Sequence, residues 1–128
     1  MPITKHNPER LFPQYRNYSH AIEISTSSRL LIISGLNGYL QDGVTMPDSF
    51  EEQGEVIWQY IGELLKSAKM TYQNIVSIRT YLASPEYDEA NVQLRMKYLV
   101  NHQPALTVVC AQLLDPKWKL EVEVMAAD

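Results

Sequence analysis

The C-terminal quarter of this 128-residue chain restricts the fold more than any other part. It contains two runs that are typical of β-strands: Ala105–Leu113, rich in β-branched and apolar residues, and Lys119–Ala126, in which apolar and polar residues alternate. A Leu-Asp-Pro-Lys sequence between them favours a turn, since proline lacks a backbone donor and aspartate can accept a bond from its own backbone. We therefore predict a hairpin whose second strand presents Glu121 and Glu123 on one face.

The remaining sequence predicts three more strands and two helices. Residues 1–14 have three of the seven prolines and no periodic pattern, so they are expected to be irregular. The first two strands are separated by a short polar turn and are expected to pair as a hairpin. The predicted elements are strands at Tyr18–Ile24, Leu30–Ser34 and Ile75–Leu82, a helix from about Ser49 to Lys69, and a helix from Ser84 to about Val100.

The first predicted helix has clear local signals. Ser49 and Glu52 fit a capping box, which satisfies backbone amides at a helix start. Apolar residues recur at helical spacing and predict a stripe that faces the core. Trp58 falls off this stripe, which leaves two interpretations open: contact with another chain, or an aromatic side chain that is partly exposed. The stripe consists of Val56, Ile57, Tyr60, Ile61, Leu64, Leu65 and Ala68.

The order of elements, ββαβαββ, predicts a single α+β domain over residues 1–128. Right-handed crossovers would put both helices on one face of a mixed sheet. The strands carry more apolar side chains than one face can use, for example Leu31, Ile33 and Val108. A second, semi-apolar face without a cover favours self-association.

Composition argues against several classes of function. The formal net charge of −4 disfavours nucleic acid as a partner, because phosphate binding needs clustered Lys and Arg. The longest aliphatic run, Leu30–Ile33, is far too short to cross a membrane, and the first residues do not resemble a signal peptide. We expect a cytoplasmic, soluble protein with neither nucleic acid nor membrane as partner. The single cysteine, Cys110, is expected to be a small buried side chain.

No motif in the sequence predicts a metal or a cofactor. His6, His20 and His102 are scattered and lack the spacing of metal ligands. His20 is expected to be structural. The phosphate-binding GxxxxGK[ST] pattern and the GxSxG pattern of a nucleophile elbow are both absent from the chain.

Several short pieces of sequence are informative through their order and spacing, although none of them is specific alone. The pieces are Tyr18-Ser19-His20-Ala21, Ile33-Ser34-Gly35, Gln53, Ile75-Val76, Tyr81-Leu82, Asn91, Gln103-Pro104-Ala105 and Leu120-Glu121-Val122-Glu123. Together they resemble the RidA/YjgF (Rid) family over about residues 15–126.

The resemblance implies a chorismate-mutase-like α+β fold and a homotrimer whose sheets form a central barrel, with clefts between the subunits. Deaminase members of the family hydrolyse reactive enamines and imines, such as 2-aminoacrylate, to a keto acid and ammonia without a cofactor. In those members an arginine after a Pro-Ala pair binds the substrate carboxylate. A glutamate on the last strand lies near the attacking water.

Position by position, the resemblance places Glu121 at the acid near the water. It places Leu106 at the arginine and Val108 at a cysteine of the family, which are the main departures. The other expected cleft residues are Tyr18, Ser34, Gly35, Asn91, Ala105 and Thr107. Glu121 also has a simpler interpretation, the polar side of an alternating strand.

Leucine in place of the arginine changes the expected chemistry. A charge-assisted hydrogen bond contributes about 1.5–3 kcal/mol, so its loss weakens carboxylate binding roughly 10- to 100-fold. We expect weak or no activity on 2-aminoacrylate, and a small apolar patch at Leu106 and Val108 that suits a ligand without a carboxylate there. Arg79 could reach a cleft or pair with Glu121 or Glu123, and a structural ion pair is favoured. Arg95 is expected to be a solvated helix charge.

Three functions follow from the resemblance. The first is an imine or enamine hydrolase with an altered substrate preference. The second is a trimer that binds a small ligand without catalysis. The third, a ribonuclease, is the least favoured because the chain is acidic and has no basic patch.

Overall fold

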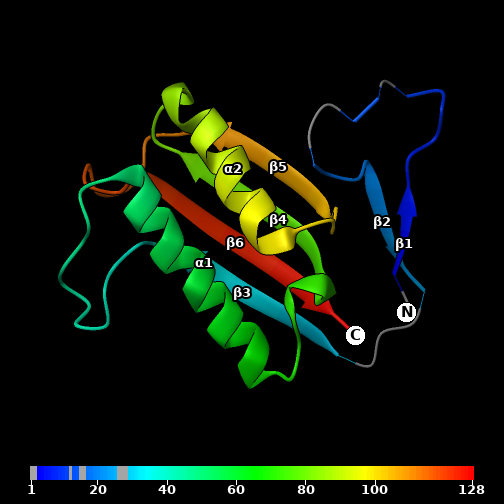
Figure 1. Ribbon diagram of the computed structural model, residues 1–128, viewed down its shortest axis with the longest axis horizontal. Coiled ribbons are helices and arrows are strands. Elements are labelled where there is room, and N and C mark those ends of the chain that lie inside the picture. Colours follow the sequence, from blue (N-terminus) through cyan, green and yellow to red (C-terminus); the bar gives the residue numbers. More distant parts are fainter. Residues whose placement is uncertain (1–2, 12, 15–16, 26–28) are drawn as a thin grey trace.

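The computed structural model describes residues 3–11, 13–14, 17–25 and 29–128. Two helices lie on one face of a four-stranded sheet, and a short two-stranded ribbon stands beside it (Figure 1). This arrangement confirms the prediction of a mixed α+β fold with both helices on the same face. The described elements are β1 (Ile3–His6), β2 (Ala21–Ile24), β3 (Leu30–Leu36), α1 (Phe50–Ser67), β4 (Ile75–Leu82), α2 (Asp88–Leu99), β5 (Ala105–Cys110) and β6 (Leu120–Ala127), with 3-10 turns at Tyr72–Asn74 and Pro85–Tyr87.

The strand order in the larger sheet is β3-β6-β4-β5. β6 is antiparallel to both of its neighbours, and β4 and β5 are parallel. The predicted hairpin between the last two strands is therefore wrong. β5 follows the α2 crossover and pairs with β4, as a strand–helix–strand unit requires. The connection after β5 then carries the chain to the gap between β3 and β4, where β6 hydrogen-bonds along both of its edges.

The predicted hairpin of the first two strands is also wrong. β2 pairs with β1, which lies in the region expected to be irregular, and β3 pairs with β6. The strand predicted from Tyr18 begins only at Ala21, since Ser19 instead forms an isolated parallel bridge with Ala105. The strand predicted to reach Leu113 ends at Cys110. The turn after it is confirmed, with Asp115 Oδ1 accepting the Lys117 amide at 2.8 Å.

The core lies between the helices and the sheet. Along β6, Leu120, Val122 and Val124 are buried against this layer. The alternation predicted for this strand is thus confirmed. The side chains between them point to the other face of the sheet, which none of the described helices covers and which we call the open face.

Gln53 ties the start of α1 to the start of β6. Its buried amide donates to the carbonyls of Pro47 at 2.8 Å and Lys117 at 3.0 Å, and its Oε1 accepts the Lys119 amide at 2.9 Å. At the start of the same helix, Ser49 Oγ accepts the Glu52 amide at 3.0 Å, as the capping prediction requires. These bonds fix where β6 enters the sheet, just before Glu121.

Three side chains differ from their predicted environments. Trp58 is buried, because Tyr98 stacks on its ring with a centroid separation of 5.6 Å. Arg95 is also buried instead of solvated, since its helix packs this side chain inward. Cys110 is exposed, because it ends β5, the edge strand of the four-stranded sheet.

Candidate functional site

The open face carries most of the polar side chains that the sequence analysis selected on β6. Glu121, Glu123 and Met125 point to this face, and β4 adds Ser77, Arg79 and Tyr81 in register beside them. The edge near β3 is apolar, with Leu30 56% and Ile32 69% exposed. This face therefore combines a charged centre with an exposed apolar margin.

A β-bulge places Glu121. Ile33 pairs with Val124 and Leu36 pairs with Val122, so Ser34 and Gly35 together occupy the space opposite one residue of β6. A Cβ at Gly35 would lie 3.0 Å from the carboxylate carbon of Glu121, and closer still to its Oε2. The missing side chain thus leaves the room that this carboxylate occupies. The bulge brings together three of the predicted site residues.

Asn37 completes this group. Its Nδ2 lies 3.5 Å from Glu121 Oε1, a long hydrogen bond. The sequence analysis did not select Asn37, because it lies in a loop without periodic pattern. Its position one residue beyond the bulge pair Leu36–Val122 could be recognised only once the register was known.

Arg79, Tyr81 and Glu123 form a second cluster on the open face. Glu123 Oε1 lies 3.3 Å from Arg79 Nη1 and accepts the Tyr81 hydroxyl at 2.9 Å. This acceptor raises the pKa of Tyr81 above its usual value. Of the alternatives for Arg79, the structure contains the ion pair with Glu123.

The four predicted site residues on β5 divide between the two faces. Leu106 and Val108 are in register with Ile78 and Thr80, and both pack against the core. Thr107 is in register with Arg79 and shares the open face with it. The side chains expected to form an apolar ligand patch are therefore engaged, in part, in packing within the chain.

Tyr18 lies at the start of β5, away from Glu121. The adjacent Ser19 bridges Ala105, and the rings of Tyr18 and His20 meet edge to face with centroids 5.4 Å apart. Glu121 lies two strands away and four residues further along, which corresponds to roughly 16 Å at ~4.8 Å per strand and ~3.3 Å per residue. One chain therefore does not bring Tyr18 and Glu121 together.

Asn91 occupies a third place. It is 2% exposed on α2, in the helical layer, whereas Glu121 lies on the open face. Its Nδ2 has no hydrogen-bond partner among the described residues. A buried donor without a partner is unusual in a native fold.

Within the described ranges, no group of three or more His, Cys, Asp or Glu side chains is placed to hold a metal ion. No helix in the described part of the chain is both long enough and apolar enough to span a bilayer.

Known proteins resemble this chain along most of its length. The yeast (Saccharomyces cerevisiae) protein MMF1, described as mitochondrial, is 25% identical over 91% of this chain and 78% of its own length. The chloroplastic Reactive Intermediate Deaminase A of Arabidopsis thaliana is 27% identical over 85% of this chain, which spans 57% of that protein. The crystal structure of a Rid-family protein of unknown function from Yersinia pestis, YyfB, covers both chains completely, with 27% identity and a TM-score of 0.88.

A family model gives the most extensive sequence match. The model, described as endoribonuclease L-PSP, matches residues 9–128. This range includes every element from β2 to β6. The predicted resemblance is confirmed, and the chain belongs to the YjgF/Rid family.

Proposed function

We propose that this protein is a RidA-like hydrolase of enamines or imines with an altered substrate preference. The observation that carries the proposal is the seating of Glu121 on the bulge at Ser34 and Gly35. A carboxylate held at a bulge, with one amide neighbour and one open side, is suited to orient a water. The name of the Arabidopsis relative, a reactive intermediate deaminase, supports the same chemistry.

The proposed reaction needs few groups. Glu121 accepts a proton from a water molecule whose oxygen attacks the imine carbon. The proton passes to the nitrogen and gives a carbinolamine. A second proton then passes from its hydroxyl group to the same nitrogen as the carbon–nitrogen bond breaks, and a carbonyl compound and ammonia leave. An enamine would first take a proton on carbon to become the imine. A single positioned base of this kind typically contributes 10²- to 10⁴-fold, that is, about 3–5 kcal/mol of barrier.

The predicted site residues lie in two separate places on one chain, and this separation supports a site in clefts between subunits. Tyr18 and Ala105 lie at the β5 edge, and Glu121 lies toward the β3 side. A second copy that presents its β5 edge to the bulge would reunite the two halves. We propose a homotrimer in which the open faces meet around a central barrel and Tyr18, Ala105 and Thr107 of one copy approach Glu121 of the next.

Turnover measurements test the proposal. The purified protein is mixed with freshly generated 2-aminoacrylate and with a set of bulkier imino acids, and ammonia and carbonyl products are followed. We expect turnover of at least one bulkier imine, and a loss of about 100-fold or more in Glu121→Gln. Glu86→Gln, which removes an exposed carboxylate from a 3-10 turn, is the matched control and should keep full activity.

A second candidate is a trimer that binds a small ligand without catalysis. The buried Nδ2 of Asn91, which lacks a partner among the described residues, favours it, because such a donor can be satisfied by a ligand or a water. Glu121→Ala distinguishes the two functions. It would abolish turnover by a hydrolase and leave ligand affinity largely unchanged in a simple binding protein.

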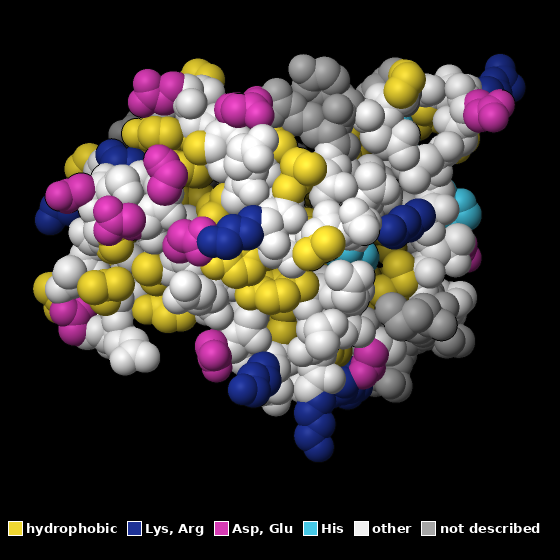
Figure 2. Space-filling view, viewed as in Figure 1, with side chains coloured by type: hydrophobic (Ala, Val, Ile, Leu, Met, Phe, Trp, Pro, Cys, Tyr) yellow, Lys and Arg dark blue, Asp and Glu magenta, His cyan; other side chains and the backbone are white. Residues whose placement is uncertain are grey.

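A ribonuclease activity, which the description of the family model suggests, is less favoured for this chain. On the face that carries the helices, Lys and Arg side chains are interspersed with Asp and Glu (Figure 2). RNA binding would require a basic patch and a salt-dependent affinity. A gel-shift assay with single-stranded RNA tests for such binding. The expected cytoplasmic location of the protein stays a prediction.

A further inference from the structure

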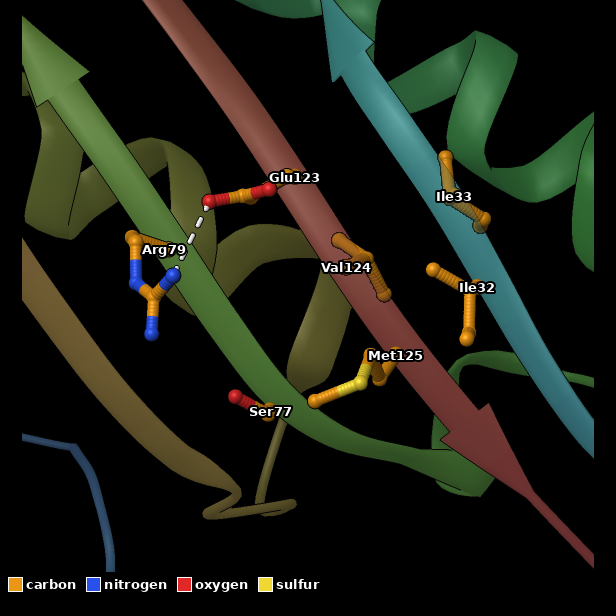
Figure 3. A pocket seen from close by; sticks show the side chains of 7 residues that line it. All are labelled: Ile32, Ile33, Ser77, Arg79, Glu123, Val124 and Met125. Atoms are coloured by element: carbon orange, nitrogen blue, oxygen red, sulfur yellow. Dashed lines mark hydrogen bonds and ion pairs between the residues drawn. The ribbon is translucent and has the colours of Figure 1, made fainter.

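A pocket on the open face lies between β3, β6 and β4, and its lining does not include Ser34, Gly35 or Glu121 (Figure 3). Its volume is about 120 Å³. One end carries Arg79 and Glu123, and Ile32 and Met125 project beside the other. The pocket therefore has an ion pair at one end, with the guanidinium the more exposed partner, and an apolar wall at the other. A small amphiphilic anion can use both ends.

The guanidinium of Arg79 has more N–H donors than its described contacts use. Arginine offers five N–H groups. Among the described residues, Arg79 makes the 3.3 Å ion pair through one Nη1 and an interaction with the Tyr81 hydroxyl. The side chain is 58% exposed, compared with 36% for Glu123. An incoming carboxylate can thus bind the free edge of the guanidinium while Glu123 and Tyr81 hold it in place.

Volume and lining set the size of the ligand. An apolar cavity of about 150 Å³ accepts a benzene molecule, so a space of this size holds about five or six non-hydrogen atoms. Ile32, at 69% exposure, and Met125, at 38%, would both gain from contact with a short hydrocarbon chain. Ser77 adds a hydroxyl at the pocket wall beside Met125 (Figure 3).

We propose that this pocket binds a short aliphatic monocarboxylate of about three to four carbons, with the carboxylate on Arg79 and the chain along Ile32 and Met125. The site is independent of the hydrolysis proposed at Glu121. In the proposed homotrimer it would open toward the central barrel, where the open faces meet.

An NMR titration of the full-length ¹⁵N-labelled protein with butyrate tests the site. We expect saturable shifts at the amides of Ser77, Arg79 and Met125. Butan-1-ol, which lacks the charge, and acetate, which lacks the chain, should each bind at least ~10-fold more weakly than butyrate. Light scattering on the same samples records whether the oligomeric mass changes with ligand.

Variants of the two partners of the ion pair, Arg79 and Glu123, distinguish a role in butyrate binding from a purely structural role. Arg79→Met should weaken butyrate binding ~10- to 100-fold. Glu123→Gln removes a competing carboxylate and should strengthen it. Arg10→Met, which removes an exposed arginine outside the pocket, should leave the affinity unchanged. A structural ion pair alone would lower the melting temperature in both pocket variants without moving the affinity in opposite directions.

The inference is overturned if butyrate produces no saturable shift at these amides, including the case in which self-association closes the pocket. It is also overturned if Arg79→Met binds butyrate as tightly as the unaltered chain. Loss of imine turnover in Glu121→Gln with intact butyrate binding would separate the two sites. Imine turnover by the unaltered protein without butyrate binding would leave the hydrolase standing without this pocket.

Discussion

Gly35 lies directly beneath the carboxylate of Glu121, and the glutamate's Oε2 fills the space that a Cβ at Gly35 would need. The relationship depends on the bulge in β3, which brings the glycine under a residue of β6 that regular pairing would place elsewhere. Because the obstructing atoms belong to the flexible end of a side chain, a methyl group here would displace the carboxylate more than the backbone.

Gly35→Ala should therefore affect catalysis more than stability. A displaced Glu121 would lose its position relative to the substrate, and an error of about 1 Å can cost roughly 100-fold in rate. We expect imine turnover to fall by that order while the urea midpoint changes little. Gly43→Ala is the control, in which the urea midpoint should fall and turnover should not. Its φ of +71° strains an alanine, at about 1 kcal/mol, but no atom lies within 4 Å of the added methyl group, so turnover should remain.

Gln53→Ala should destabilise the fold. The buried amide makes three hydrogen bonds to the backbone of two loops, and its removal leaves the Pro47 and Lys117 carbonyls and the Lys119 amide without this partner. We expect a loss of about 2–4 kcal/mol in the free energy of unfolding, measured by urea titration. Gln73→Ala, the same deletion at an exposed position, should cost much less. Equal losses of unfolding free energy in both variants would contradict the role of Gln53 in joining the start of α1 to the start of β6.

Local patterns predicted the elements but not their pairing. The helices, β4 and β6 were recognisable because periodicity and caps are properties of short segments, as the Ser49 cap illustrates. Both hairpins were wrong because the chain pairs β6 with β3 and β4, which lie far away in sequence. β6 pairs with β3 and β4 because this placement satisfies the hydrogen bonds along both of its edges. A turn sequence such as Asp115-Pro116 does not indicate which strands will pair.

Leu30→Glu should break the proposed homotrimer. Its side chain is 56% exposed on the apolar margin of the open face, and a carboxylate there would be buried without a partner when copies associate. Size-exclusion chromatography with light scattering should give three times the 14.7 kDa chain mass for the unaltered protein and a smaller mass for the variant. Val44→Glu, at a residue that is 79% exposed in a loop, should leave the trimer intact. A monomeric unaltered protein would refute the assembly.

His102 should make stability depend on pH. Burial lowers the pKa of its imidazole below the ordinary value of 6.5, against the opposing effect of its 2.6 Å bond to the Ile75 carbonyl, and nearby Lys5 lowers it further. Below about pH 6.5 the unfolded chain therefore binds a proton that the folded chain does not, so the free energy of unfolding falls as pH falls. Above that pH the contribution is fully present. Urea titrations between about pH 7.5 and 5.5 should show this slope, and His102→Gln should flatten it.

The candidate site was only partly visible in the sequence. Positions taken from the family resemblance located Ser34, Gly35 and Glu121, which the bulge brings together. The neighbours Asn37 and Tyr81 were not selected, because their approach depends on the register of β6 against β3 and β4. The register also shows why Leu106 could not be assigned to a ligand surface from alternation alone, since it faces the same side as Ile78.

Leu106→Arg tests whether substrate choice, and not the chemistry, distinguishes this chain. The resemblance puts the carboxylate-binding arginine of the deaminases at this position. Leu106 lies on the edge strand β5 and is only partly buried, so the longer side chain can extend past the edge with its charge in water. We expect turnover of 2-aminoacrylate to rise at least ~10-fold, since a charged hydrogen bond to the substrate is gained. Val109→Arg, on the same strand but the open face, should not produce this gain. If Leu106→Arg folds normally, as judged by circular dichroism, and still hydrolyses no imine, the catalytic role proposed for Glu121 is refuted and ligand binding becomes the favoured function.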